Sequence, residues 1–341
     1  MVAGRRPGRR TNLALLVLLV GSLVTGCAAY AVGRPPESRV VAVAHGVLGL
    51  GIVVLAPWKS AIVRRGMRRP RGHRVGIAFA VLVTVSLLAG VAHATFGRLE
   101  LDHVTALAVH VAAAAAAVPF AVSHVVRRRQ RLRSTDLSRR VVLRAAGLGA
   151  VTALAYAGQD ALTALADLPG ATRRGTGSYE VGSGRPGAMP VTQWFTDAVP
   201  RIEPAAYELE VSGSDGRTRR LNHDDLMAMD SVVESAVIDC TGGWWAEQAW
   251  RGVRLAALLG TPQDGSITVR SVTGYTRRFP PEEAGTLLLA THAGDAALSP
   301  GHGGPVRLVA PGHRGFWWVK WVDQVRVDPH PWWAQPPFPL Q

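Results

Sequence analysis

The sequence predicts an α-helical transmembrane bundle of about five spans, followed by a separate α+β domain. Up to about residue 168, runs of Ala, Val and Leu alternate with short blocks of arginine, whereas the remaining residues are mixed in polarity and rich in Gly and Pro. Nine of the ten tryptophans lie after Met189, which marks the same change in composition. We therefore expect a membrane domain at 1–168, a flexible linker at 169–190 and a C-terminal domain at 191–341.

Four apolar stretches approach the roughly 20 residues that are needed to cross the hydrocarbon core of a bilayer. They lie at about 13–32, 40–58, 75–96 and 104–126. A fifth stretch, at about 141–168, is more broken by polar residues. These five stretches are the predicted membrane-spanning helices.

Basic residues mark one side of the predicted membrane. They precede the first span, separate the second from the third and follow the fourth, whereas the alternate loops GRPPESR and GRLELD are short and nearly neutral. The positive-inside rule puts the N-terminus in the cytoplasm and, if the fifth segment crosses, everything after about Pro169 outside. The basic residues are Arg5, Arg6, Arg9 and Arg10, then Lys59, Arg64, Arg65, Arg68, Arg69, Arg71 and Arg74, then Arg127, Arg128, Arg129, Arg131 and Arg133.

The formal net charge of +14 raises the question of nucleic-acid binding. The arginines lie in short blocks beside apolar segments rather than along a stripe that could follow a groove, so a lipid membrane explains them better. We expect no nucleic-acid partner. The two cysteines, one of them inside an apolar stretch (Cys27), cannot form a disulfide framework and do not indicate the compartment.

The fifth segment opens with SRRVVLR at 138–144, followed by the weakly hydrophobic run AAGLGAVTALAYAG. This order resembles a twin-arginine translocation signal, here internal rather than N-terminal. The alternative is one more cytoplasmic arginine pair beside a helix. A twin-arginine route carries folded domains, which suits a domain whose cofactor is inserted before export.

Four histidines lie inside the predicted spans, His93 and His124 near their ends and His45 and His110 deeper, where polar groups are costly and tend to be functional. His45 is about five residues into the second span from the outer face and His110 about six or seven into the fourth, so the two have similar depth. Two helices that offer imidazoles at matched depth meet the requirement of bis-histidine b-type haem ligation, and the segment loosely resembles small cytochrome b membrane domains. The alternative is that these histidines cap helices or hydrogen-bond across the bundle.

After the linker, short alternating segments predict strands that begin near residues 207, 266, 286, 305 and 317. Turn residues separate these segments, and short helices are expected at 222–229 and 255–259. This pattern indicates a mixed α+β domain of about 150 residues.

One short stretch of this domain, VIDCTGGWWAEQAW, places Cys240 at a strand exit, just ahead of two glycines. The run that contains it, VESAVIDCTGGWWAEQAWRGVRLAALLG, resembles the molybdenum-ligand segment of the sulfite oxidase family of molybdopterin enzymes. The later run LLLATHAGDAALSPGHGGPVRLVAPGHRGFWWVKWVDQVRV resembles the second signature of that family. With the intervening SVTGYTRRFP, the resemblance covers most of 189–327.

The resemblance makes Cys240 the expected molybdenum ligand. A thiolate is a soft, strongly donating ligand, and here it would complete the coordination that a pterin dithiolene and oxo or hydroxo groups begin. Gly242 and Gly243 permit close approach of the backbone. A buried structural cysteine is the alternative, and a zinc site is disfavoured because no second cysteine lies nearby.

The resemblance also implies that His302, Arg307 and Lys320 contact the pterin and its phosphate. Arginine and lysine suit a buried dianion, and the amides of the glycine-rich turns at 301–304 and 312–315 are further donors. The alternative for Arg307 and Lys320 is that they alternate on strands and face solvent.

The arginines that family members acting on sulfite carry after the ligand cysteine are absent from TGGWWAEQ. Arg278, with Arg277 or Arg251 as alternatives, could replace that anion clamp. Tyr275 is a candidate proton donor, or a packed strand tyrosine. Oxygen-atom transfer in general is therefore a better expectation than sulfite oxidation.

We thus expect a multi-pass protein of the cell membrane whose C-terminal domain, outside the cytoplasm, transfers an oxygen atom to or from a small molecule. Electrons would be exchanged, in a direction that the sequence leaves open, through the membrane domain with a quinone or another carrier, and through haem b if His45 and His110 bind it. One alternative is a non-catalytic exported binding module of the same fold on a membrane anchor. Another is a thiol enzyme in which His302 serves as base for Cys240.

Overall fold

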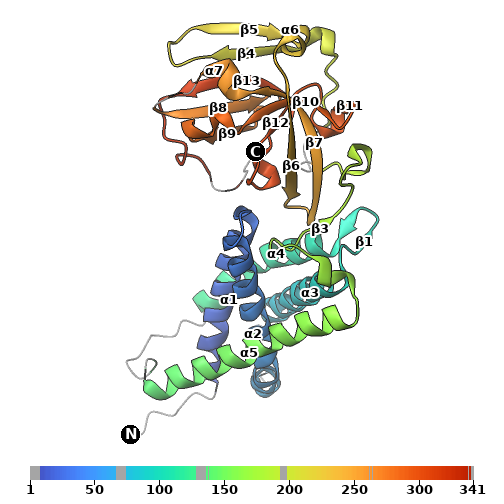
Figure 1. Ribbon diagram of the computed structural model, residues 1–341. Coiled ribbons are helices and arrows are strands. Elements are labelled where there is room, and N and C mark those ends of the chain that lie inside the picture. Colours follow the sequence, from blue (N-terminus) through green and yellow to red (C-terminus); the bar gives the residue numbers. More distant parts are fainter. Residues whose placement is uncertain are drawn as a thin grey trace. The chain divides into compact units, whose positions relative to one another are not determined.

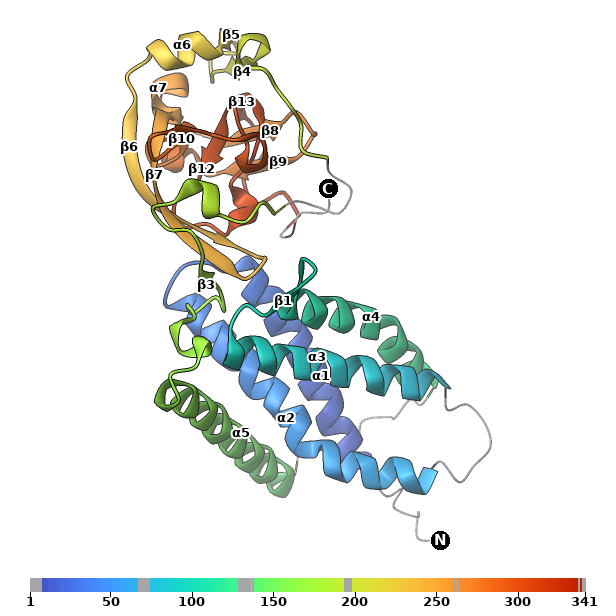
Figure 2. The same ribbon diagram turned by 90° about the vertical axis from the view of Figure 1, so that its right-hand side faces the viewer.

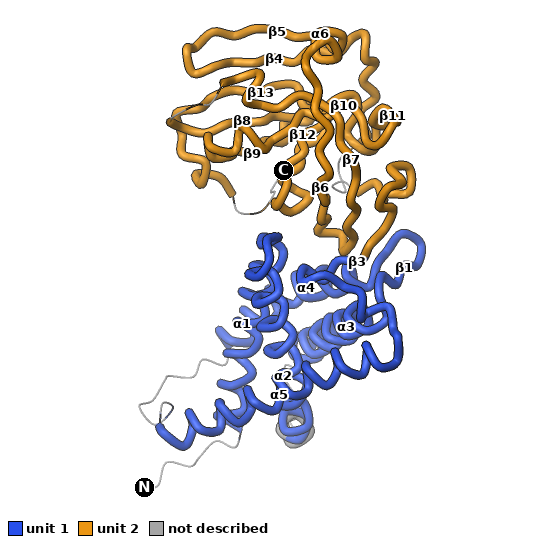
Figure 3. The backbone as a smooth tube through the Cα atoms, viewed as in Figure 1, with its two compact units in different colours: residues 1–179 blue, residues 180–341 orange. Residues whose placement is uncertain are grey.

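The structure is a computed structural model, and it describes residues 8–66, 74–127, 136, 138–192, 198–260, 262, 264–336 and 338. The chain divides into two compact units, unit 1 (Met1–Tyr179) and unit 2 (Glu180–Gln341) (Figure 3). Several residues of the predicted basic blocks lie outside the described residues. These are Arg5, Arg6, Arg68, Arg69, Arg71, Arg128, Arg129, Arg131 and Arg133.

Unit 1 is built from five long apolar helices (Figure 1). By length and composition, and within the described residues, these five are the helices able to cross a membrane. The fifth predicted span, at about 141–168, whose apolar run is interrupted by polar residues, lies in one continuous helix as far as Leu165. The helices are α1 (Arg9–Ala31), α2 (Glu37–Gly66), α3 (Arg74–Phe96), α4 (Ala106–Arg127) and α5 (Arg139–Leu165).

The helices of unit 1 pack in pairs, α1 against α2 and α3 against α4, while α5 packs against α2. Small residues allow the close approach of α1 and α2, because a β-carbon on Gly51 would lie only 2.9 Å from Leu18 Cδ2. The outer faces remain apolar, with side chains such as Leu88 and Leu154 more than two-thirds exposed. A helix that is apolar on every side needs an apolar environment.

A short hairpin, β1 (Glu100–Leu101) and β2 (Val104–Thr105), joins α3 to α4. The expected linker at 169–190 contains two 3-10 turns, η2 (Pro169–Thr172) and η3 (Pro186–Ala188), and the strand β3 (Tyr179–Glu180) between them. The unit boundary falls inside β3. The flexibility of this segment stays a prediction.

Unit 2 contains two β-sheets. In the first, β11 (Ala296–Ala297), β10 (Leu288–Ala293) and β7 (Trp244–Arg254) lie in that order, with β12 (Arg307–Val309) also on β10 and β6 (Val232–Cys240) also on β7. The second has the order β5 (Thr218–Asn222), β4 (Glu208–Ser212), β13 (Val322–Asp328), β8 (Ser266–Ser271) and β9 (Thr276–Phe279). Two short helices, α6 (His223–Ala228) and α7 (Leu255–Leu259), occur where the sequence predicts them.

The hairpin of β6 and β7 carries the candidate site at its tip (Figure 2). Its register runs from Val232 opposite Gly252 to Cys240 opposite Trp244. Gly252 is required where β7 meets β10, because a β-carbon there would clash with the carbonyl oxygen of Leu289. Pairing along the whole hairpin therefore fixes the position of Cys240.

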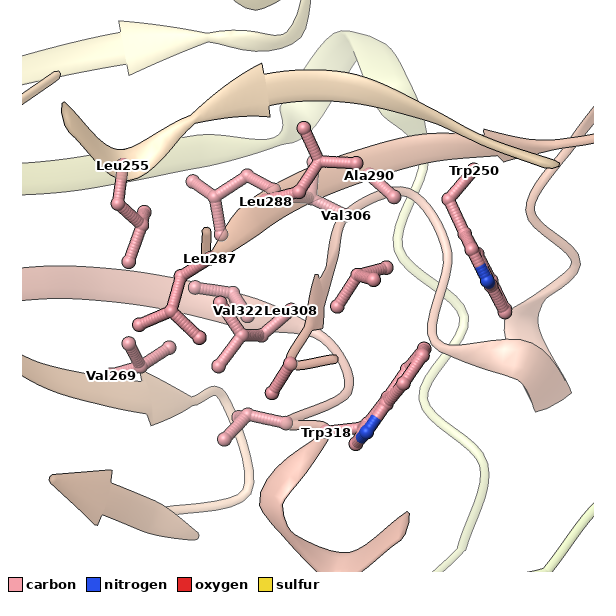
Figure 4. Packing of buried hydrophobic residues seen from close by; sticks show 14 of the residues in the cluster. Trp250, Leu255, Val269, Leu287, Leu288, Ala290, Val306, Leu308, Trp318 and Val322 are labelled. Carbon is pink, nitrogen blue, oxygen red and sulfur yellow. The ribbon is translucent and has the colours of Figure 1, made fainter. Parts of the chain in front are cut away.

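The core of unit 2 is a single cluster of buried apolar side chains that includes residues of both sheets (Figure 4). Leucine and valine side chains from β10, β12, β8 and β13 are almost fully buried, and each contributes about 1.5–3 kcal/mol on the usual transfer scale. The labelled members are Trp250, Leu255, Val269, Leu287, Leu288, Ala290, Val306, Leu308, Trp318 and Val322.

One strand prediction was wrong at its start. The strand expected from Trp317 begins only at Val322, because residues 315–317 form a 3-10 turn, η7 (Gly315–Trp317). Trp318 N donates to Gly315 O at 3.1 Å, and Trp321 has a φ of 51°. Neither feature is compatible with extended backbone.

Candidate functional site

Cys240 is the last residue of β6, and its side chain is buried in the described structure. The turn that follows is closed by a hydrogen bond from Gly243 N to Cys240 O at 3.1 Å, and the φ of Gly243, 83°, favours glycine. Gly242 N donates to Cys240 Sγ at 3.3 Å. The predicted strand exit is confirmed, and Gly242 is the residue whose amide reaches the sulfur.

An arginine of the segment 311–318 fixes the backbone at Cys240. Arg314 Nη1 donates to Asp239 Oδ1 at 2.5 Å, and its Nη2 lies 3.4 Å from Cys240 O. Both charged side chains are buried. Gly315 packs directly behind the cysteine, because a β-carbon there would lie 3.0 Å from Cys240 Cα.

Arg307, in β12, is 2% exposed. Its guanidinium lies between two indole rings, 5.1 Å from the centre of Trp250 and 5.6 Å from that of Trp318. Nη1 donates to His302 O at 3.0 Å, whereas Nε has no partner among the described residues. The alternative of a solvent-facing arginine is therefore wrong.

Within the described residues, Arg307 forms no ion pair with a carboxylate. Burial lowers the pKa of Arg307 to about 10, and the charge of the Cys240 sulfur opposes this shift. The shift expresses the cost of holding a cation in a buried position.

The other two predicted cofactor residues converge on the same turn. A β-carbon on Gly303, whose φ is 98°, would lie 3.0 Å from the Lys320 side chain and 3.1 Å from that of Arg307. Lys320 Nζ donates to Gly301 O at 2.7 Å and to Thr192 O at 3.0 Å. Glycine at this position thus lets two basic side chains come together.

His302 is held by hydrogen bonds at both ring nitrogens. Nε2 lies 3.0 Å from Met189 O, so it is the donor, and Nδ1 lies 2.8 Å from Ser299 Oγ. Burial lowers the pKa of His302, and the nearby Arg307 and Lys320 act in the same direction, while the bond to Met189 opposes them. A neutral His302 bound at both nitrogens is a poor general base for Cys240.

Thr192 connects the turn after Cys240 with the basic residues. Its hydroxyl accepts a hydrogen bond from Trp244 Nε1 at 3.0 Å, while its carbonyl binds Lys320. The site therefore extends from the tip of the β6–β7 hairpin to the turn at 299–304. The sequence analysis did not select Thr192 or Arg314, and no local pattern marks either residue.

Tyr275 and Arg277 approach the segment behind Cys240. Tyr275 Oη donates to Phe316 O at 2.5 Å and accepts from Arg277 Nε at 2.7 Å. Arg277 is buried and lies over the rings of Tyr275, Phe316 and Trp317. Arg278 has the opposite orientation on β9, and its Nη1 donates to Ala334 O at 2.6 Å. The structure brings Tyr275 and Arg277, but not Arg278, to the cysteine segment.

In unit 1, His45 and His110 face one another, with ring centres 5.8 Å apart and planes at 83°. His45 Nδ1 lies 3.0 Å from Ser22 O, and His110 Nδ1 lies 2.8 Å from Ser86 O. Because a carbonyl only accepts, both Nδ1 atoms are donors. In the neutral rings each Nε2 then presents a lone pair, which is the arrangement of metal-binding histidines.

The residues around Cys240 fit an anionic cofactor that brings its own metal ligands. Within the described residues, no group of three or more His, Cys, Asp and Glu side chains could hold a metal ion, so a metal at Cys240 needs ligands from elsewhere. The unsatisfied Nε of Arg307 and the nearby Lys320 suit a phosphate group.

The family described as "Oxidoreductase molybdopterin binding domain" matches residues 196–335. The uncharacterized oxidoreductase YuiH of Bacillus subtilis (strain 168) is 30% identical over 147 residues, which cover 40% of this chain and 74% of that protein. The NADH nitrate reductase of Volvox carteri is 27% identical over 38% of this chain and 20% of that protein. The sulfite oxidase of Gallus gallus is 28% identical over 38% of this chain and 37% of that protein.

Among solved structures, the sulfane dehydrogenase SoxCD of Paracoccus pantotrophus is 24% identical, with a TM-score of 0.36, over 38% of this chain and 40% of that one. The fold and the site of unit 2 define a cofactor-binding oxidoreductase domain. The chain belongs to the oxidoreductase molybdopterin-binding domain family. It spans about a fifth of the nitrate reductase and about a third of the sulfite oxidase that it matches.

Proposed function

We propose that this protein is a membrane-anchored molybdopterin-dependent oxidoreductase that transfers an oxygen atom to or from a small substrate. The observation that supports this most directly is Arg307, a buried cation that shares the turn at Gly303 with Lys320 and has no carboxylate partner in the described structure. Such a cation needs a bound anion, and, because the described residues hold no cluster of three metal-binding side chains, a metal at Cys240 would arrive with its cofactor.

Cys240 would bind molybdenum, and Arg307 and Lys320 would bind the phosphate of the pterin. The cofactor supplies a metal centre that changes oxidation state by two electrons. Arg314 holds the backbone of Cys240 through Asp239, and His302 fixes the turn at 299–304 through Met189 and Ser299. These contacts set the positions of the binding groups before the cofactor arrives.

Tyr275 would serve the substrate side of the site. Its hydroxyl group donates to Phe316 O, and the hydroxyl oxygen, Tyr275 Oη, accepts a hydrogen bond from Arg277 Nε. The phenol is thus positioned to hold or move a proton at Oη near the segment that packs behind Cys240. Arg277, rather than Arg278, is the residue that orients it.

His45 and His110 would hold the iron of a b-type haem that exchanges electrons with unit 2. The two rings face one another, and in each of them Nε2 would be the atom that binds the iron, because Nδ1 carries the proton. The Ser22 and Ser86 carbonyls set the ring orientation.

The five apolar helices of unit 1 would cross the cell membrane, with the N-terminus in the cytoplasm and unit 2 on the outer side. Arg139 and Arg140, in the first turn of α5, would belong to the internal twin-arginine signal. A quinone or another electron carrier would be the partner of unit 1.

The alternative, a non-catalytic binding module on a membrane anchor, is supported by Tyr275 and Arg277. The two side chains hydrogen-bond to one another and to main-chain carbonyl groups, and Arg277 Nη1 donates to Pro336 O at 2.9 Å. A binding module would keep its affinity for its partner when Cys240 is replaced.

Metal and pterin analysis of the full-length protein purified from membranes tests the proposal. We expect stoichiometric molybdenum in the wild type, its loss in Cys240→Ser, and its retention in Cys27→Ser, which changes the exposed cysteine of α1. A folded wild-type preparation without molybdenum would contradict the enzyme proposal. If a binding partner is found and Cys240→Ser keeps its affinity, the binding module is correct.

A further inference from the structure

A cluster of polar side chains lies at the C-terminal ends of α3 and α5 in unit 1, away from the residues used so far. His93, in the last turn of α3, is 6% exposed, and its Nε2 lies 2.9 Å from Gly177 O. Tyr179 Oη donates to His93 O at 2.5 Å, and its ring lies edge-on to the imidazole with centres 5.2 Å apart.

The second ring nitrogen of His93 has no partner among the described residues. Because Gly177 O can only accept, Nε2 carries a proton, and Nδ1 of the neutral ring presents a lone pair. Buried polar atoms are nearly always satisfied, and leaving one unsatisfied is costly. Nδ1 is buried and unsatisfied, so it suits a ligand that donates a hydrogen bond.

The groups next to His93 connect it to the aqueous surface. Arg173 Nη1 donates to Ala94 O, one residue beyond His93, at 2.8 Å, and its Nη2 pairs with Asp160. The Asp160 side chain is 45% exposed. A proton that leaves the buried imidazole therefore has an ionisable group nearby, at the edge of the bundle.

The cluster is also close to the two histidines that face one another. Ser86, whose carbonyl binds His110 Nδ1, precedes His93 on α3 by two helical turns, or about 10 Å along the axis. A redox-active ligand at His93 would thus lie near the proposed haem.

We propose that His93 Nδ1 accepts a hydrogen bond from the hydroxyl group of a quinol, and that this site exchanges electrons between the quinol and unit 1. A quinol supplies the missing donor, whereas a carboxylate or a quinone carbonyl alone does not. The edge-on ring of Tyr179 offers an aromatic neighbour to a flat ligand ring. The inference rests on the proposed function, and it names the partner of its electron-carrying unit.

The overall reaction balances. A quinol gives up two electrons and two protons to become a quinone, while an oxidised substrate RO takes up the same two electrons and two protons to give R and water. One proton leaves the quinol hydroxyl toward His93 Nδ1. In the reverse direction, R, water and quinone give RO and quinol, and the same hydrogen bond forms as the quinol is produced.

Fluorescence titration with the quinol analogue heptylhydroxyquinoline N-oxide tests the site on the purified full-length protein. We expect saturable binding to the wild type, and binding at least about tenfold weaker for His93→Phe. His93→Gln should bind more weakly than the wild type but more tightly than His93→Phe, because the glutamine amide can donate to Gly177 O while its carbonyl oxygen accepts from the quinol hydroxyl. The control is His103→Gln, which changes a fully exposed imidazole and should leave affinity unchanged.

Wild-type affinity in His93→Phe would overturn the inference, as would binding to His93→Gln that is no tighter than binding to His93→Phe. Loss of haem absorption in both His93 variants would also overturn it, since the imidazole would then serve the haem. Molybdenum analysis of the same samples separates the two proposals. If the protein lacks molybdenum but binds the analogue in a manner that depends on His93, the proposed function alone is contradicted. If the protein contains molybdenum but shows no such binding, the quinol site alone is contradicted.

Discussion

Two buried arginines of unit 2 show how differently a protein can treat a buried charge. Arg314 pairs with Asp239, and both side chains are buried together. Arg307 is as deeply buried, but within the described residues its hydrogen bonds go to main-chain oxygens, those of His302 and Trp318. A buried ion pair is satisfied by the protein itself, whereas an unpaired cation reduces stability until an anion binds. Arg314 is therefore a structural residue and Arg307 a binding residue.

Replacing each arginine by methionine separates these roles. In cofactor-free protein we expect Arg307→Met to raise the melting temperature, because it removes a buried charge without orphaning a carboxylate. Arg314→Met should destabilise the same protein by about 3–5 kcal/mol, because it removes the cation that is paired with the buried carboxylate of Asp239. Calorimetry on protein from a host that cannot make the pterin measures both effects.

The cofactor content of the two variants, produced in a competent host, completes the comparison. Arg307→Met should bind much less molybdopterin although its cofactor-free form is the more stable. A destabilised Arg307→Met that keeps its cofactor would show that the arginine supports the fold instead.

At the scale of elements, the sequence predicted the helices and strands whose residue pattern alone indicates the structure that they adopt in the fold. Helix α6 begins at a capping box in which Asn222 and Asp225 bond reciprocally, and β4, β8 and β10 alternate or are uniformly apolar. Strands β5 and β9 were not predicted, because arginine and threonine dominate their sequences. Pairing with a neighbouring strand, which no local pattern reveals, makes them strands.

The end of β13 depends on a buried carboxylate, Asp328. Thr268 Oγ1 of β8 lies 3.4 Å from Oδ2, Arg326 Nη2 donates to Oδ2 at 2.9 Å, and His330 N donates to Oδ1 at 2.9 Å. Burial alone would raise the pKa of Asp328, but the hydrogen bonds from His330 and the charge of Arg326 outweigh it and lower the pKa. The carboxylate thus connects β13, β8 and the chain that follows.

A lowered pKa means that Asp328 contributes stability above the unfolded value of about 3.9, and that this contribution is lost as the pH falls through the lower folded value. We expect the melting temperature of the wild type to fall more steeply below about pH 5 than that of Asp328→Asn. Thermal unfolding of the full-length protein across this range measures the difference. Equal slopes would mean that the ionised form of Asp328 has no net advantage in the fold.

At the scale of the whole molecule, the sequence predicted a change of character between the two halves and singled out Cys240, His302, Arg307 and Lys320, but not how these residues meet. Cys240 and Arg307 could be paired only through the family resemblance, because no periodicity relates residues so far apart in the chain. The structure adds the physical reason, a glycine at 303 that lets Arg307 and Lys320 touch one turn. His45 and His110 were paired by depth alone, and the two carbonyls that orient them were not predictable.

If the two units have separate redox sites, each can be removed without the other. We expect His45→Ala and His110→Ala each to abolish haem absorption in the purified protein, because a bis-histidine iron loses an axial ligand in either variant. Molybdenum content should stay at the wild-type level, since Cys240 and Arg307 belong to the other compact unit. Optical spectra and metal analysis of the same samples provide both readouts.

His103→Ala, at a fully exposed position, is the matched control and should keep both cofactors. Haem that persists in the His45 and His110 variants would assign the iron to other ligands. Loss of molybdenum together with haem would mean that the two units fold or load as one. Loss of haem alone would place the membrane part of the electron path on the facing imidazoles, and it would leave unit 2 as an independently loaded molybdopterin domain.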